Sequence, residues 1–172
     1  YVRAYAINSK GTAYGEEISF TTLKQVVLPT VTTTSATSVT ETSAVTGGNV
    51  TSDGNASVTE RGVVYATTQN PTTANTKVAS GNGTGSFVCN LSGLQPNTKY
   101  YVRAYAINSK GTAYGEEITF ITNKSISLPI VTTAAATSVT ESSAVTGGNV
   151  TSDGNASVTE RGVVYATTQN PT

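Results

Sequence analysis

Residues 94–108 read LQPNTKYYVRAYAIN, and the rest of the chain is best understood outward from this stretch. A Pro-Asn turn leads into a run rich in Tyr, Val and Ile, which predicts a long β-strand over residues 100–108. Side chains alternate between the two faces of a strand. If Tyr100 and the residues at 102, 104 and 106 face a core, an outward row follows, made of Tyr101, Arg103, Tyr105 and Ile107.

This outward row is the best candidate interaction surface in the sequence. Tyr and Arg supply contact area at low entropic cost and are enriched at interfaces, and aromatic rings also stack on sugars. Three interpretations stay open: ordinary support of a solvated sheet, lateral contact with another chain, and glycan binding. The strand that contains Arg61, Val63 and Tyr65 is expected in the same sheet. The sequence allows either these residues or the alternate set, Glu60, Gly62 and Val64, to share the face of the outward row.

The chain repeats itself, because residues 1–72 recur as residues 101–172 with ten substitutions. A period of 100 residues is too long for a solenoid unit and matches a self-contained β-sandwich. We therefore expect residues 1–22 to be the C-terminal part of one repeat, residues 28–122 a complete repeat, and residues 128–172 the N-terminal part of the next. On this hypothesis the sequence is a window on a longer polypeptide.

The composition argues for an all-β, non-catalytic chain. There is no His, Met or Trp, only 12% of the residues are charged, and about a fifth are Thr. The commonest general base is therefore missing. A formal net charge of zero gives no electrostatic reason to expect nucleic acid as a partner. No run of apolar residues is long enough to predict membrane insertion.

Alternating β-formers between turns predict strands at 30–39, 43–50, 58–67, 86–91, 100–108 and 116–122, with a polar stretch ending at Ser80. With one further strand this makes about seven, the number of an immunoglobulin-like sandwich. The predicted fold class is thus all-β, as tandem seven-stranded β-sandwiches.

The spacing Leu94-x-Pro96-x-Thr98-x-Tyr100, followed by the strand above, resembles the fibronectin type III superfamily. The resemblance implies a tyrosine corner, in which Leu94 and Pro96 shape the turn and Tyr100 bonds the upstream backbone. The usual tryptophan of the second strand is absent. Residues 59–72 are similar to the variant found in repetitive, secreted surface proteins of the Bacteroidota, which implies an extracellular, cell-surface setting reached by type IX secretion.

No metal or cofactor site is predicted. Asp53 sits in an Asp-Gly-Asn turn, and one carboxylate is too few for calcium, so a structural turn is the better interpretation. Cys89 shares a strand face with Phe87 and Leu91, which predicts a buried thiol; an intermolecular disulfide requires the opposite phase.

A linker of about five residues without glycine separates Thr122 from Leu128, which favours a stiff rod. We expect a non-catalytic repeat of an extended extracellular stalk or filament of an adhesin, as a single chain or self-associated into a homo-oligomeric filament. A cell-surface or glycan target would be reached through other regions. The alternative is a spacer or carbohydrate-binding accessory module of a secreted polysaccharide-degrading enzyme.

Overall fold

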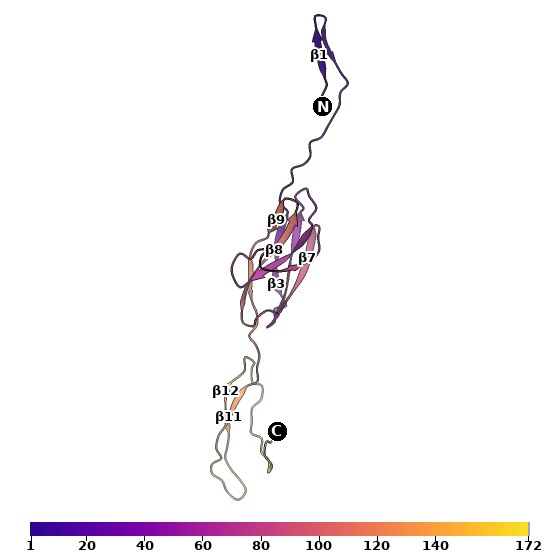
Figure 1. The fold of residues 1–172 in the computed structure, drawn as a ribbon. Helices are drawn as coiled ribbons and strands as arrows, with labels where there is room; N and C mark the ends of the chain where they lie inside the picture. Colours follow the sequence, from indigo (N-terminus) through magenta and orange to yellow (C-terminus); the bar gives the residue numbers. More distant parts are fainter. Residues whose placement is uncertain (172) are drawn as a thin grey trace.

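The computed structural model describes residues 1–171, and these residues form β-strands and connecting segments without helices (Figure 1). Near the N-terminus is a hairpin of β1 (Tyr5–Asn8) and β2 (Gly11–Tyr14). The central region holds β3 (Thr30–Thr37), β4 (Ser43–Ser52), β5 (Glu60–Ala66), β6 (Thr76–Ala79), β7 (Gly85–Ser92), β8 (Lys99–Asn108), β9 (Gly111–Tyr114) and β10 (Ile118–Ile121). A second hairpin pairs β11 (Ile130–Thr133) with β12 (Gly148–Ser152).

The central strands form two antiparallel sheets. One has the order β3-β4-β7, and the other has the order β10-β8-β5-β6 with β9 also paired to β8. The long strand β8 organises the second sheet, since it pairs with β5 along one edge and with β9 and then β10 along the other. Two sheets that each present one apolar face bury those faces against each other, which gives the β-sandwich that the sequence predicts.

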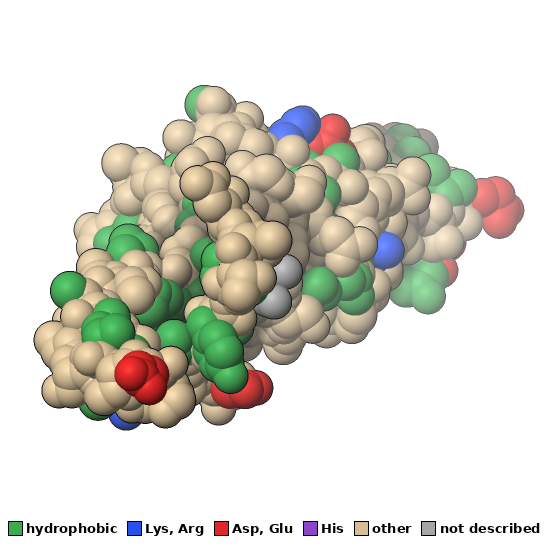
Figure 2. Space-filling model, turned by 90° about the horizontal axis from the view of Figure 1, so that it is seen from below, with side chains coloured by type: hydrophobic (Ala, Val, Ile, Leu, Met, Phe, Trp, Pro, Cys, Tyr) green, Lys and Arg blue, Asp and Glu red, His purple; other side chains and the backbone are tan. Residues whose placement is uncertain are grey.

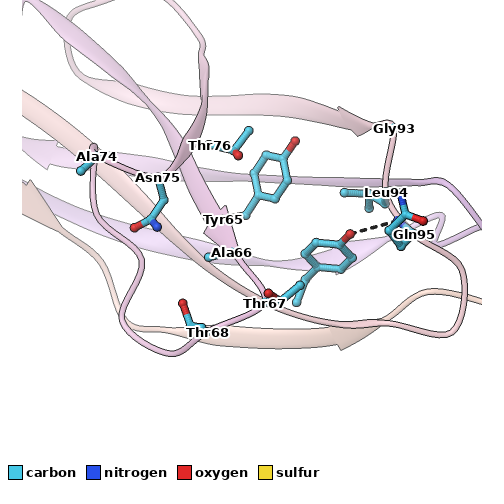
Figure 3. Close-up of a pocket in the computed structure, with 11 residues that line it drawn as sticks. Tyr65, Ala66, Thr67, Thr68, Ala74, Asn75, Thr76, Gly93, Leu94 and Gln95 are labelled. Carbon is cyan, nitrogen blue, oxygen red and sulfur yellow. Dashed lines mark hydrogen bonds between the residues drawn. The ribbon is translucent and has the colours of Figure 1, made fainter.

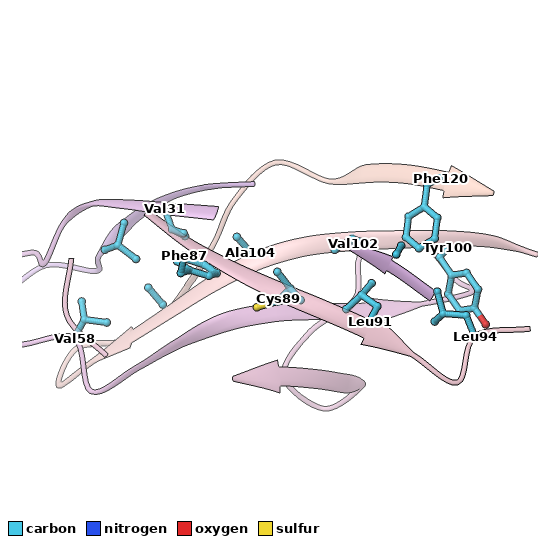
Figure 4. Close-up of a cluster of buried hydrophobic side chains, with 14 residues drawn as sticks. Val31, Val58, Phe87, Cys89, Leu91, Leu94, Tyr100, Val102, Ala104 and Phe120 are labelled. Carbon is cyan, nitrogen blue, oxygen red and sulfur yellow. The ribbon is translucent and has the colours of Figure 1, made fainter. Parts of the chain in front are cut away.

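A single apolar core lies between the two sheets (Figure 4). The β3-β4-β7 sheet contributes Val31, Ala44, Val50, Phe87, Cys89 and Leu91, and the other sheet contributes Val63, Tyr100, Val102, Ala104, Ala106 and Phe120. The prediction that Cys89 lies on the core face is confirmed, because its side chain is 2% exposed. The small residues Gly48 and Ala104 lie opposite each other, and a Cβ at Gly48 would stand 2.7 Å from that of Ala104. The sheets therefore approach closely at their centre.

Two strands were not predicted from the sequence. The expected polar stretch before Ser80 contains β6, a short edge strand whose only sheet partner among the described residues is β5. The strand expected at 116–122 corresponds to β10, which pairs with the first half of β8. It is preceded by the unpredicted strand β9, which follows the turn at 109–110 and pairs with the last residues of β8. Short strands with mostly polar residues carry little periodic signal, and their pairing is imposed by the neighbouring strand.

The open phase of β5 is settled by its register. Val63 pairs with Ala104 and Tyr65 pairs with Val102, so both lie on the core face, while Val64 lies on the outer face opposite Arg103. Val63 and Val64 are nevertheless both completely buried. Alternation could not reveal this phase because both faces of β5 are covered.

The segments on either side repeat parts of the central sequence but leave their apolar side chains exposed. Phe20 is 69% exposed whereas its counterpart Phe120 is 9% exposed, and Val163 is 47% exposed whereas Val63 is 0% exposed. Figure 1 shows these segments at opposite ends of the central sandwich. Seen from below in Figure 2, apolar side chains lie on the surface and charged ones are few. A few strands alone cannot bury an apolar face.

Candidate functional site

The linker that enters the sandwich is hydrogen-bonded to a turn of the same sandwich. The Val27 amide donates to the Gly54 carbonyl at 2.9 Å, and the Asn55 side-chain amide donates to the Gln25 carbonyl at 2.9 Å. The buried Asn108 at the end of β8 donates to the carbonyls of Val27 at 2.7 Å and of Asp53 at 2.8 Å. Linker, turn and sheet are therefore joined through one buried amide.

The turn has a conformation that few sequences allow. Gly54 and Asn55 both have positive φ, at 69° and 66°, and the Asp53 carboxylate accepts the Asn55 amide at 2.9 Å. Gly and Asn tolerate this left-handed region better than other residues. A Cβ at Gly54 would stand 2.2 Å from the Val27 carbonyl oxygen. Only glycine lets the linker pass this closely, so the Asp-Gly-Asn turn has the structural role that the sequence predicts.

The same arrangement recurs at the next linker. The Ser127 amide donates to the Gly154 carbonyl at 2.8 Å, and the Asn155 side chain donates to the Ser125 carbonyl at 2.9 Å. Gly154 has φ 67°, and a Cβ there would stand 2.0 Å from the Ser127 oxygen. Both contacts use linker backbone atoms. This explains how the linker side chains can differ between copies, with Val27 replaced by Ser127, while the contacts persist.

The second linker is also tied to the sandwich that it leaves. The Asn123 amide donates to the Thr40 carbonyl at 3.0 Å, its side chain donates to the Val39 carbonyl at 3.1 Å, and its own carbonyl accepts the Asn97 amide at 2.9 Å. All three partners lie in loops at the C-terminal end of the sandwich. The chain therefore leaves this end along a defined path.

Glu41 extends this attachment further into the linker. Its carboxylate accepts the Ile126 amide at 3.1 Å and the Ser125 hydroxyl at 3.3 Å. The Ser125 carbonyl in turn accepts the Asn155 side chain of the following segment. Ser125 thus connects the sandwich before the linker with the turn after it. We call residues 123–127, together with the residues to which they are hydrogen-bonded, the joint. Every linker residue except Lys124 takes part in a hydrogen bond to one side or the other.

The tyrosine corner lies beside the joint. The Tyr100 hydroxyl accepts the Gln95 amide at 3.0 Å, which is the upstream backbone contact that the resemblance implies (Figure 3). The buried Thr122 hydroxyl donates to the Gln95 carbonyl at 2.6 Å and accepts the Thr98 amide at 2.9 Å. The Leu94 side chain is 3% exposed and packs in the core. The corner therefore fixes the last residue before the linker.

The outward row of β8 is only partly available at the surface. Tyr101, Arg103 and Ile107 are partly exposed, but Tyr105 is 0% exposed, so the expectation that its side chain offers contact area is wrong. The guanidinium of Arg103 lies 4.7 Å from the Tyr114 ring centre and donates to the Gly115 carbonyl at 3.0 Å. Lys99 lies 4.9 Å from the Tyr101 ring centre. Whether the remaining row binds a partner stays a prediction.

The loop between β5 and β6 is attached to the outer face on which Tyr105 lies. The Thr73 amide donates to the Tyr114 hydroxyl at 2.9 Å, the Asn70 amide donates to the Glu117 carboxylate, and Pro71 is fully buried. Tyr105 and Val64 share this face and have no exposed surface. This loop therefore lies against the outer face beside Tyr114.

A charged cluster borders this face. The Tyr105 hydroxyl donates to the Glu60 carboxylate at 2.6 Å, and Lys77 forms an ion pair with Glu60 at 2.7 Å. The hydrogen bonds from Lys77 and Tyr105 lower the pKa of the Glu60 carboxyl. Burial raises the pKa of the Tyr105 phenol, and its bond to Glu60 raises it further. The cluster is structural and joins three side chains, one each from β5, β6 and β8.

Other chemistry-bearing groups are held in structural positions. Burial raises the pKa of the Cys89 thiol, which lies 3.6 Å from the Val78 carbonyl. No group of three or more His, Cys, Asp or Glu side chains that could hold a metal occurs within residues 1–171. The described part of the chain also contains no helix that could span a membrane.

Comparisons with known proteins give likenesses of fold. No family model matches the chain, and no curated protein matches it. Among solved structures, the sensor domain of the anti-sigma factor RsgI4 of Pseudobacteroides cellulosolvens is 20% identical, with 58% of this chain and 99% of that chain covered and a TM-score of 0.44. The FN1–FN3 domains of chicken CNTN1 are 24% identical, with coverage of 71% and 40% and a TM-score of 0.45. The third fibronectin III domain of the human KIAA0343 protein is 16% identical, with coverage of 65% and 97% and a TM-score of 0.41. The neighbours are thus fibronectin III and similar β-sandwich domains, while the fold itself is established by the two sheets described above.

Proposed function

We propose that this chain is a non-catalytic structural repeat of an extended extracellular stalk or filament, of the kind that holds the adhesive part of a cell-surface protein away from the cell. The observation that carries the proposal is the joint. Hydrogen bonds tie residues 123–127 to the sandwich before them and to the turn after them. A linker in which four of five residues are hydrogen-bonded to one side or the other restricts bending and favours a rod.

The repeat supports this proposal because three of the residues that hold the linker belong to the repeated sequence, although the linker residues 123 and 125–127 themselves differ from residues 23 and 25–27. Glu41, Gly54 and Asn55 recur as Glu141, Gly154 and Asn155. Each added copy therefore brings a carboxylate and a Gly-Asn turn that can hold the backbone of the linkers beside it. A sandwich with strands of about ten residues extends the array by roughly 30–35 Å. Reach then grows in proportion to the number of copies.

The setting is proposed on the sequence resemblance. Residues 59–72 resemble repetitive surface proteins of the Bacteroidota, and this resemblance favours a secreted adhesin exported by the type IX route. Equivalent surfaces at a regular spacing also allow several such chains to associate side by side, through the partly exposed Tyr101 and Arg103.

Electron microscopy of the native full-length protein tests the proposal. A single-chain stalk predicts straight fibres about 20–30 Å wide, since two sheets pack about 10 Å apart and carry side chains on both sides. Thicker ordered fibres would indicate laterally associated chains. Short flexible particles beside a hydrolase domain would contradict the stalk and favour a spacer in an enzyme.

A further inference from the structure

At the C-terminal end of the sandwich, the two sheets part around a depression of about 840 Å³. It lies between the end of β5, the start of β6 and the corner at 93–95, with Tyr65 at its centre (Figure 3). We propose that this depression binds a neutral saccharide, so that the stalk itself recognises glycans along its length. This goes beyond the mechanical role proposed above; binding by a single repeat does not depend on that role, whereas recognition along the stalk rests on it.

The size of the depression suits a small ligand. Small-molecule sites in proteins commonly measure about 300–1,000 Å³. The rings of Tyr65 and Tyr100 meet edge to face, with centres 6.0 Å apart. Tyr100 is held by the Gln95 amide and by stacking on Phe120, whose ring centre is 5.7 Å away. The aromatic floor is therefore rigid before any ligand arrives, which lowers the entropic cost of binding.

The polar groups around Tyr65 are available to a ligand. The Tyr65 and Thr76 hydroxyls and the Gln95 side-chain amide make no hydrogen bond within the described residues, and Asn75 uses its carbonyl oxygen on the Thr72 amide but keeps its NH₂ group. Figure 3 shows Asn75 and Thr76 on one side of the Tyr65 ring and Gln95 on the other. Donors and acceptors thus converge on an aromatic surface from two sides.

The charge of the lining selects the class of ligand. None of the residues that line the depression, all within the described part of the chain, is charged. A phosphate or carboxylate ligand would lack a cationic partner, and a cation would lack a carboxylate. A purely apolar ligand would leave the hydroxyl and amide groups unpaired. A neutral sugar offers hydroxyl groups for the rim and an apolar ring face for Tyr65.

The repeat can place several copies of this site on one chain. Residues 65–68, which form one side of the depression, recur without change as residues 165–168. A copy that also repeats residues 74–76 and 93–100 would carry the same depression. Several sites on one stiff array bind a polymeric glycan far more tightly than one site does.

Nuclear magnetic resonance titration tests the proposal on the intact chain. The probes are neutral hexasaccharides of glucose, mannose, galactose and xylose at millimolar concentration, with hexagalacturonate as the anionic comparison. Residues 73–100 occur once in the sequence, so the signals of Asn75 and Gln95 have no near-duplicates. We expect at least one neutral probe to shift the signals of Asn75, Gln95 and Tyr100, and hexagalacturonate to shift none.

Variants localise the site. Tyr65→Ala is expected to weaken binding by about tenfold or more, as the loss of an aromatic anchor commonly does. Because Tyr65 also packs against the core, exposed Gln95→Ala is the second variant, with a loss of about three- to tenfold. Tyr101→Ala, on the outer face, is the matched control and should bind normally. Absence of shifts with every neutral probe, equal loss in the control, or binding of an uncharged peptide in place of the sugars would overturn the proposal.

Discussion

Removal of the Glu41 carboxylate should loosen the joint without unfolding the sandwich. Glu41 accepts the Ile126 amide and the Ser125 hydroxyl, and it lies in a loop outside the core. In Glu41→Ala both linker donors lose this partner and return to water. The three hydrogen bonds of Asn123 remain, so the linker stays attached at its first residue but becomes free over 125–126.

The size of the effect follows from the two lost contacts. A net intramolecular hydrogen bond contributes about 0.5–1.5 kcal/mol, and contact of this carboxylate with solvent keeps each bond in the lower half of that range. Two such bonds give about 1–2 kcal/mol. That free energy changes the ratio of attached to detached linker by roughly 5–30-fold. The detached state should therefore become clearly populated.

Distance measurements between spin labels detect this change. Val88→Cys and Val145→Cys place labels on β7 and beyond the joint, at positions whose native side chains are 66% and 59% exposed. The buried Cys89 should not react with the label. Glu41→Ala should broaden the distance distribution. The matched control is Glu141→Ala, which removes the equivalent carboxylate in the next copy, where it makes no hydrogen bond within residues 1–171.

The reasoning would be refuted if the distance distribution of Glu41→Ala were the same as that of the control Glu141→Ala and of the protein that keeps both carboxylates. It would also be refuted if Glu41→Ala lowered the thermal stability of the sandwich by as much as a core truncation, because the carboxylate would then hold the fold and not the joint. An unchanged melting temperature with a broadened distribution is the expected result.

Three further predictions concern the sandwich. Because the folded-state pKa of Tyr105 is raised, its stabilising contribution is complete below the unfolded value of about 10 and is lost as pH rises above it. Urea unfolding between about pH 8 and pH 11 should show this fall, and Tyr105→Phe should reduce it while weakening the fold at neutral pH through loss of the bond to Glu60. Cys89 should react with a thiol reagent only on unfolding, since it is buried with a raised pKa; rapid reaction of the native protein would contradict its placement. Gly54→Ala should destabilise by more than about 1 kcal/mol, and by more than Gly81→Ala, where φ is also positive but a Cβ would meet nothing within 4 Å. Equal losses in denaturant titrations would show that the close linker contact is unimportant.

Part of the functional site could be expected from residue types alone. The Asp-Gly-Asn turn, the short linker and the contact of Tyr100 with the upstream backbone each depend on local chemistry, namely positive φ, chain length and one hydroxyl at fixed spacing. The role of Glu41 was missed, since a single carboxylate in a polar loop has no local signature. Its partners Ser125 and Ile126 lie more than 80 positions away in the chain, with separations of 84 and 85 residues.

The sequence by itself determined the all-β class, the strands 43–50 and 100–108, the buried face of Cys89 and the repeat of 100 residues. These follow from side-chain alternation and from comparison of the chain with itself, which are local or one-dimensional properties. Only the tertiary structure decided which side chains on the outer face meet solvent. Alternation placed Tyr105 outward correctly, but exposure depends on what lies above a face, and here Glu60 and Lys77 from neighbouring strands contact its hydroxyl and its ring. The phase of β5 stayed ambiguous for the same reason, because Val63 and Val64 are buried by different layers. A periodic pattern reports the direction of a side chain, whereas burial depends on distant segments that the fold brings together.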